Sequence, residues 1–203
     1  MKGEGNVASA WNFSGPMLAA LASALAARDP YTAAHAAHVT FLAGRLAAWL
    51  DWEEQRLRAL HVGAPLHDIG KVAVSDAILQ KPGPLDAREL AEIRIHPVAG
   101  ARLIGPVGPA SVALPYVLYH HERWEGGGYP TGRAGDAIPE EARLLSVVDA
   151  FDAMISSRPY RRALATTGAL AEIERCAGSQ FDPAMAEAFL TAWEAGALAR
   201  SAA

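Results

Sequence analysis

The sequence predicts an all-α fold, a helical bundle with a metal site in its core, from three observations. No segment sustains the apolar–polar alternation of a half-buried strand. Apolar residues instead recur at helical spacing in most segments of the chain. Several of the seven histidines end or interrupt these apolar segments, where a polar side chain needs a hydrogen-bond partner or a metal ion.

Composition limits the class of protein. The 203 residues, 51% hydrophobic and 20% charged, suit one globular domain. We expect it to span residues 16–195, between tails at 1–15 and 196–203. The net charge of −4 offers no basic face for a polymeric nucleic acid, and no apolar run reaches the ~20 residues of a membrane span. The one cysteine, Cys176, excludes an internal disulfide, suits the reducing cytoplasm and is interpreted as a buried hydrophobe.

Three helices are expected first, at residues 16–29, 32–50 and 53–67. Asp29-Pro30 separates the first two, because the residue before a proline disfavours the helical conformation. His35 falls on the apolar face of the second helix, either as a structural histidine or as a metal ligand. His61 lies nearly opposite His67 on the third helix and is interpreted as a packing or surface residue.

The third helix leads into the stretch on which the chemistry depends, His67-Asp68-Ile69-Gly70-Lys71. An imidazole and a carboxylate stand side by side at the end of a largely apolar segment. A carboxylate has four lone-pair sites, so Asp68 can share one ion with His67 or bridge two ions. A His-Asp pair is common by chance, and the prediction therefore depends on ligands from elsewhere in the chain.

A second histidine follows a proline-rich loop. Two prolines and a glycine fix the loop at residues 81–85. Asp86 then opens a helix, with Glu89 three residues later in a variant of the capping box. His96-Pro97 interrupts that helix, and a histidine at such a break can face a cavity.

Residues 111–119 are apolar and end at His120-His121, a kind of pair found in metal-ligand clusters. The following segment, 126–132, is too rich in glycine for regular secondary structure. It is either a flexible loop or, because Trp124 and Tyr129 offer flat apolar faces, a loop for base stacking or partner docking.

The last third of the chain adds acids and cations. Pro139 starts a helix that embeds Asp149 and Asp152 in mostly apolar surroundings. Residues 158–162 gather three cations, either as a solvated turn or as a clamp for phosphate. Two further helices, at about 167–176 and 183–193, complete the domain.

Seven short motifs occur in this chain. They are DPYTxxH (29–35), HDIGK (67–71), ILxKPGPL (78–85), HP (96–97), HHERWxGxGYP (120–130), DAFDAM (149–154) and RPYR (158–161). Together they resemble the HD-GYP family, a branch of the HD superfamily of metal-dependent phosphohydrolases. The resemblance extends from about Leu18 to Leu190, in the family's order.

The resemblance implies an HD-superfamily helical fold with two, sometimes three, divalent ions, commonly iron or manganese. It implies hydrolysis of the bacterial second messenger cyclic di-GMP to linear pGpG, and in some members on to GMP, by a hydroxide that bridges the ions. Asp68 would be the bridging carboxylate and Lys71 a catalytic cation. The implied metal ligands are His35, His67, Asp68, His96, His120, His121 and Asp149. The implied substrate-binding residues are Lys71, Tyr129, Asp152, Arg158 and Arg161.

Two positions depart from the family pattern. Members with three ions have a glutamate four residues before the first histidine, where this chain has Tyr31. A neutral phenol is a poor ligand for a hard cation, so we expect two ions and a reaction that stops mainly at pGpG. His38 stands where many relatives have arginine and receives no role.

Several alternatives stay open. The substrate could be cyclic GMP–AMP. Alternatively, the chain could be a non-catalytic signalling or binding module that acts through the loop at residues 126–132, which contains Gly128-Tyr129-Pro130 and is called the Gly-Tyr-Pro loop below. A protein partner at that loop and a homodimer are open too. Relatives usually carry a receiver or sensory domain, and the sequence does not decide whether this chain is full length or excised from a larger protein.

Overall fold

The computed structural model describes residues 20, 22–25, 27, 30–105, 108–157 and 162–199, without the side chains of residues 30–33 and 109. Within these ranges it contains helices and turns but no strand, and one isolated bridge joins Ala177 and Phe181. The predicted all-α class is confirmed. None of the described helices combines the length and the apolar character needed to cross a lipid bilayer.

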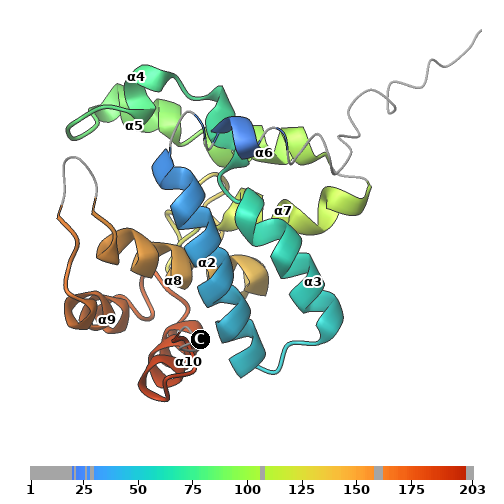
Figure 1. The fold of residues 1–203 in the computed structure, drawn as a ribbon, viewed down its shortest axis with the longest axis vertical. Coiled ribbons are helices and arrows are strands. Elements are labelled where there is room, and N and C mark those ends of the chain that lie inside the picture. Colours follow the sequence, from blue (N-terminus) through green and yellow to red (C-terminus); the bar gives the residue numbers. More distant parts are fainter. Residues whose placement is uncertain are drawn as a thin grey trace, which may run out of the picture.

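The described helices are mostly short and are joined by tight turns (Figure 1). In order they are α2 (Pro30–Trp49), α3 (Glu54–Gly63), α4 (Asp76–Leu79), α5 (Ala87–Ile93), α6 (His96–Ile104), α7 (Leu114–Tyr119), α8 (Glu140–Ile155), α9 (Thr166–Arg175) and α10 (Pro183–Glu194). Two 3₁₀ turns, Ala64–Leu66 and Ile69–Ala73, flank the His67-Asp68 pair.

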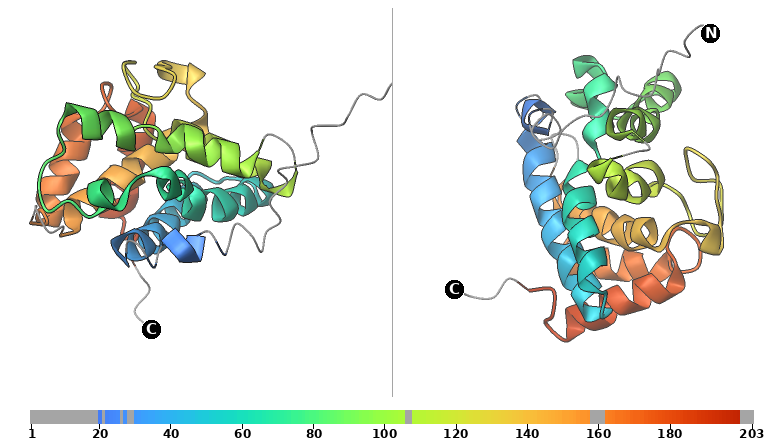
Figure 2. Two further views of the ribbon diagram at one scale, coloured as in Figure 1. Left: turned by 90° about the horizontal axis from the view of Figure 1, so that it is seen from above. Right: turned by 90° about the vertical axis from the view of Figure 1, so that its right-hand side faces the viewer.

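Helix α2 runs through the middle of the molecule with α3 beside it (Figure 1). Helices α4, α5 and α6 lie at one end, and α9 and α10 lie at the other (Figure 1). The loop between α7 and α8, drawn in yellow, projects from one side of the molecule (Figure 2).

Two hydrophobic clusters hold the helices together. The larger joins α2, α8 and α10, and in it the ring of Phe151 lies 4.9 Å, centroid to centroid, from the rings of both Phe189 and Trp193. The smaller consists of Leu66, Ile69, Ile104, Ala113 and Val117. His67 and Asp68 lie in the chain between Leu66 and Ile69, so packing of the smaller cluster holds the His67–Lys71 segment in place.

Prolines explain where two helices differ from their predicted bounds. Helix α2 begins at Pro30, two residues early, because proline is favoured in the first turn of a helix. Helix α3 ends at Gly63 and not at residue 67, because Pro65 lacks an N–H and disrupts an α-helix that would continue through it. A 3₁₀ turn replaces its last turn.

The other elements match their predictions more closely. Asp86 accepts hydrogen bonds from the backbone N–H groups of Arg88 and Glu89, and the Glu89 side chain accepts from the Asp86 N–H, which confirms the capping box. His96-Pro97 separates α5 from α6 as expected. The short helix α4 was not predicted. The expected helix at 16–29 falls largely outside the described residues, of which 20, 22–25 and 27 are helical.

The packed domain continues beyond residue 195. Leu198 is 2% exposed and belongs to the larger cluster, and the Arg45 side chain donates to the Ala197 carbonyl at 2.6 Å. Residues 196–199 are therefore part of the fold and not of a tail. The expected tail at 1–15 lies outside the described residues.

Close backbone contact at Gly70 fixes the His67–Lys71 segment against α6. A Cβ atom at Gly70 would overlap the carbonyl oxygen of His96 and the backbone nitrogen of Gly100. Gly100 faces Val117 and Gly70 in turn. Only glycine permits this approach, which brings Asp68 and His96 together.

We predict that Gly70→Ala lowers the free energy of unfolding by about 3 kcal/mol or more, because backbone atoms on both sides must move. Gly168→Ala is the matched control, since Gly168 lies in α9 with open space around it. Alanine is the better helix former there, so its stability should be unchanged or raised by up to ~1 kcal/mol. Thermal unfolding followed by circular dichroism measures both, and equal melting temperatures would contradict the prediction.

Candidate metal centre

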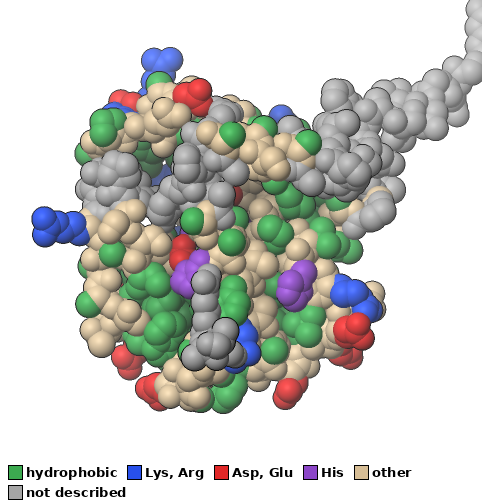
Figure 3. Space-filling model, viewed as in Figure 1, with side chains coloured by type: hydrophobic (Ala, Val, Ile, Leu, Met, Phe, Trp, Pro, Cys, Tyr) green, Lys and Arg blue, Asp and Glu red, His purple; other side chains and the backbone are tan. Residues whose placement is uncertain are grey.

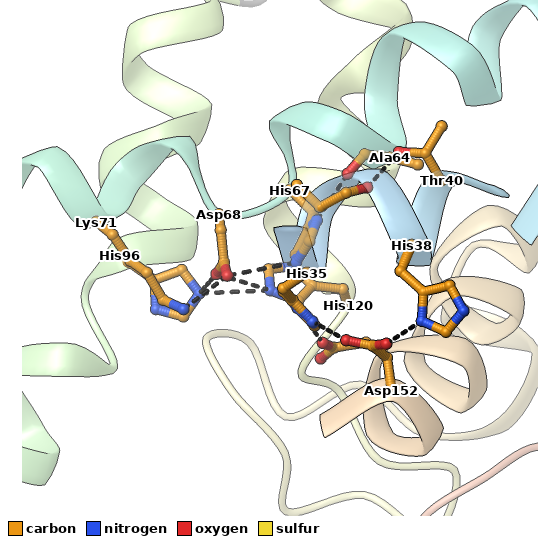
Figure 4. A network of polar contacts seen from close by, with 12 residues as sticks. His35, His38, Thr40, Ala64, His67, Asp68, Lys71, His96, His120 and Asp152 are labelled. Atoms are coloured by element: carbon orange, nitrogen blue, oxygen red, sulfur yellow. Dashed lines mark hydrogen bonds and ion pairs between the residues drawn. The ribbon is translucent and has the colours of Figure 1, made fainter. Parts of the chain in front are cut away.

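Histidines from several helices converge on Asp68 in the interior (Figure 4). Their potential ligand atoms form two groups, within each of which all atoms lie within 4.8 Å of one another. The groups are His35, His67 and Asp68, and Asp68, His96, His120 and His121. Asp68 belongs to both groups, as a bridging carboxylate requires. The remaining predicted ligand, Asp149, lies 3.0 Å from His35 Nε2 through its Oδ1.

Local helical geometry orients three of the histidines. The Nδ1 atoms of His67, His96 and His120 contact the carbonyl oxygens three residues earlier, at 2.6, 2.7 and 3.1 Å respectively. A carbonyl can only accept, so each Nδ1 carries the proton. Each Nε2 is therefore left as a lone-pair donor that faces the cluster, the tautomer that metal-binding histidines adopt.

His35 is oriented by a carboxylate instead of a carbonyl (Figure 4). Its Nδ1 lies 2.5 Å from Oδ2 of Asp152, and the other oxygen of Asp152 contacts Nδ1 of His38. Asp152 is 1% exposed, and both of its oxygens are engaged. Asp152 is therefore placed to orient His35, and the substrate contact expected for it stays a prediction.

The two oxygens of Asp68 face different neighbours. Oδ2 lies 2.6 Å from Lys71 Nζ and 3.4 Å from His67 Nε2, whereas Oδ1 lies 3.3 Å from His96 Nε2. Burial alone would raise the pKa of Asp68, but the positive charge of Lys71 opposes this effect, and the pKa is held well below its usual range. Asp68 is thus an anion in a site where it is only 4% exposed.

Burial lowers the pKa of His120 and His121. It holds the pKa of His120 well below its usual value and lowers the pKa of His121 to about 3, so both rings are neutral at pH 7. At His35, hydrogen bonds to Asp149 and Asp152 outweigh burial and raise the pKa to about 10. Without a metal ion, a proton therefore stands between His35 and Asp149.

The donor set fits a divalent cation. Nε2 of His67 is buried and has no hydrogen-bond partner, an arrangement that a bound cation would relieve. The groups combine imidazoles and carboxylates without a thiolate, which suits first-row divalent ions. On the part of the face that Figure 3 colours, charged side chains are scattered and histidine reaches the surface in small separate patches. The expected ligands His67 and His120 are each only 1% exposed.

The structure describes only some of the residues expected to bind substrate. Lys71 contacts Asp68, as given above. Tyr129 lines a cavity of about 230 Å³ beside three expected ligands, His120, His121 and Asp149. Arg158 and Arg161 lie outside the described residues, as does the side chain of Tyr31.

Two of the remaining predictions concerned residues outside the cluster, and both are confirmed. His61 is exposed and contacts the Leu57 carbonyl at 2.7 Å through Nδ1, away from the centre. Cys176 is buried in the larger hydrophobic cluster.

Glu122 holds the Gly-Tyr-Pro loop and was not singled out from the sequence. It is 3% exposed, and its Oε1 accepts 2.7 Å hydrogen bonds from both the N–H and the hydroxyl of Thr131. The Trp124 N–H donates to the Gln180 carbonyl at 3.0 Å, and the Tyr129 N–H donates to the His121 carbonyl at 3.2 Å. The loop is therefore anchored at several points. Its position directly after the histidine pair was the available signal.

A helical bundle in which one aspartate joins histidines from separate helices defines a metal-centre domain of the HD type. Residues 19–185 match the family model described as HD domain. A solved structure, Bd1817, an HDG"Y"P protein from Bdellovibrio bacteriovorus, superposes with a TM-score of 0.65 over 82% of this chain and 53% of that chain, at 20% identity. The chain belongs to the HD domain family, in its HD-GYP branch.

Curated relatives are more similar in sequence. The cyclic di-GMP phosphodiesterase response regulator RpfG of Xanthomonas campestris pv. campestris is 40% identical over 175 residues, which cover 85% of this chain and 46% of the relative. The 3′3′-cGAMP-specific phosphodiesterase 2 of Vibrio cholerae is 35% identical over 176 residues, 86% of this chain and 34% of the relative. The chain spans less than half the length of these relatives.

We predict that Asp152→Asn weakens metal binding about 10- to 100-fold, because an NH₂ group, which only donates, would replace one of the two acceptor oxygens that face His35 and His38. Asp136→Asn is the control, since Asp136 is 89% exposed and pairs with Arg143 away from the cluster. Competition with a chromophoric chelator measures the affinity. Unchanged metal affinity together with a raised KM would instead support direct substrate contact by Asp152.

Proposed function

We propose that this chain is a phosphodiesterase that hydrolyses cyclic di-GMP, mainly to linear pGpG. The observation that carries the proposal is the placement of Asp68 in both ligand groups, with the cavity at Tyr129 next to them. One relative of 40% identity is named a cyclic di-GMP phosphodiesterase, which supports this substrate. The proposed reaction adds water to one phosphorus and breaks one P–O bond, so the ring opens.

The position of each expected site residue suggests its role in the proposed reaction. Asp68, His67, His96, His120, His121, His35 and Asp149 would hold two divalent ions, iron or manganese, which supply Lewis acidity and a water of lowered pKa. Lys71, 2.6 Å from Asp68 and 18% exposed, lies at the edge of the cluster and would donate to a phosphoryl oxygen. The anchored Gly-Tyr-Pro loop would limit access of bulk water from the side of His121.

The non-catalytic alternative receives less support from the cluster. Loss of ligands would favour a binding module, whereas each of the seven expected ligands lies in the cluster or in contact with it. Cyclic GMP–AMP is the second candidate substrate, because a relative of 35% identity is named for it. A cytoplasmic location, a protein partner at the loop and a homodimer stay predictions.

Anaerobic purification followed by metal counting tests the proposal directly. We expect about two ions per chain, turnover of cyclic di-GMP to pGpG, and loss of both in Asp68→Ala. Asp76→Ala, at an exposed acid that begins α4, should keep both. Chelation should abolish turnover, and Fe²⁺ or Mn²⁺ should restore it. Faster turnover of cyclic GMP–AMP would select the second substrate, and bound metal without any product would favour the binding module.

A second prediction concerns the number of ions. Residue 31 precedes His35 by about one turn of α2, where three-ion members of the family have a glutamate. We predict that Tyr31→Glu raises the metal content from two ions to three and increases the share of GMP among the products. Tyr31→Phe should change neither. Three tightly bound ions in the unaltered protein would refute the two-ion site.

A further inference from the structure

Arg94 lies at the junction between α5 and α6, two residues before His96. Its side chain is exposed, and no carboxylate among the described residues forms an ion pair with it. An unpaired surface arginine is common by itself. Its surroundings distinguish this one.

The ring of Tyr129 links Arg94 to the metal centre. The Cζ atom of Arg94 lies 5.3 Å from the centroid of the Tyr129 ring, which is cation–π distance. The same ring lies 4.8 Å from the ring of His121 with the two planes tilted by 30°. Because the Tyr129 N–H is also bonded to the His121 carbonyl, the tyrosine is held at backbone and side chain. The guanidinium is therefore one aromatic ring removed from an expected metal ligand.

The cavity beside Tyr129 has Arg94 in its wall. Arg94, Arg123, His121 and Asp149 all line this space of about 230 Å³. Arg123 is already engaged, since its guanidinium bonds Glu125 and lies 3.4 Å from the Gln180 side chain. Of these two arginines, Arg94 is the one whose N–H donors have no hydrogen-bond partner among the described residues. The cavity thus presents an uncommitted guanidinium next to the centre.

We propose that Arg94 is a substrate-binding residue that holds the phosphate of the cyclic dinucleotide that is not being hydrolysed. This inference rests on the proposed function. A cyclic dinucleotide carries two phosphodiesters, and the one that reacts must lie at the ligand cluster. Arg94 is separated from that cluster by the Tyr129 ring, so it suits the second anion and not the first.

The chemistry of the side chain supports this assignment. A guanidinium donates two parallel hydrogen bonds to phosphate oxygens and stacks on an aromatic face at the same time. Stacking on Tyr129 holds the fork in place before the ligand arrives, which reduces the ordering cost of binding. Because this phosphate does not react, the contact contributes to binding of the substrate and of the transition state alike.

The test compares Arg94→Gln with Arg88→Gln in the full chain loaded with metal. Arg88 is the matched control, because it is an exposed arginine of α5 outside the cavity wall. Equilibrium dialysis with cyclic di-GMP gives Kd, and turnover gives kcat and KM. We expect Arg94→Gln to raise Kd and KM about tenfold or more, with kcat within about twofold of the unaltered protein and with equal metal content. Arg88→Gln should change Kd and KM less than about twofold.

The results that overturn the inference are distinct from those that overturn the function. A Kd of Arg94→Gln within about twofold of the unaltered protein, an equal loss in Arg88→Gln, or a loss explained by missing metal would refute a phosphate contact. Binding of cyclic di-GMP without turnover by the unaltered protein would refute the proposed function, and dialysis would still decide the role of Arg94. If the unaltered protein neither binds nor cleaves cyclic di-GMP, both proposals fall.

Discussion

The structure depends on the burial of the Asp68 carboxylate among histidines. An isolated buried carboxylate is strongly unfavourable, so its environment has to supply compensating charge on more than one side. The Lys71 ammonium compensates Oδ2 from the 3₁₀ turn that follows Asp68. Oδ1 faces the Nε2 lone pair of His96 on α6, and a cation shared by these two atoms would compensate it. The requirement for partners on both oxygens explains why segments distant in sequence must meet at this residue.

The backbone satisfies that requirement through two kinds of contact. The hydrogen bonds from Nδ1 to carbonyls three residues earlier turn His67, His96 and His120 inward without using any residue from elsewhere in the chain. The missing side chain of Gly70 then lets its own segment approach α6 closely. The orientation of each of these histidines is therefore set locally, at the end of its own helical segment. The approach of the segment containing Asp68 to α6 depends instead on the packing of Gly70.

This division explains what the sequence could predict. The ligand types, the break at His96-Pro97 and the capping box at Asp86 follow from residues a few positions apart, and local spacing predicted them. The end of α3 at Gly63 was misjudged, because the helical pattern was extended through Pro65. The pairing of His35 with Asp152 joins residues 117 positions apart, and no local pattern reveals such a contact. The approach of Arg94 to Tyr129 was missed for the same reason.

The Gly-Tyr-Pro loop connects Tyr129, which lies next to the expected ligand His121, to the rest of the fold. Glu122, which precedes the loop, accepts a hydrogen bond from the Thr131 N–H. The backbone N–H groups of Trp124 and Glu125 donate to the carbonyls of Gln180 and Ser179, just before α10. Tyr129 is thereby held against His121 from one side and by the body of the domain from the other. A loop anchored in this way presents its tyrosine at a set distance from the ligand cluster, so it can define the depth of the cavity. Glycine in this segment serves close approach to the backbone of Glu122 and Arg123, at Gly128, as well as conformational freedom.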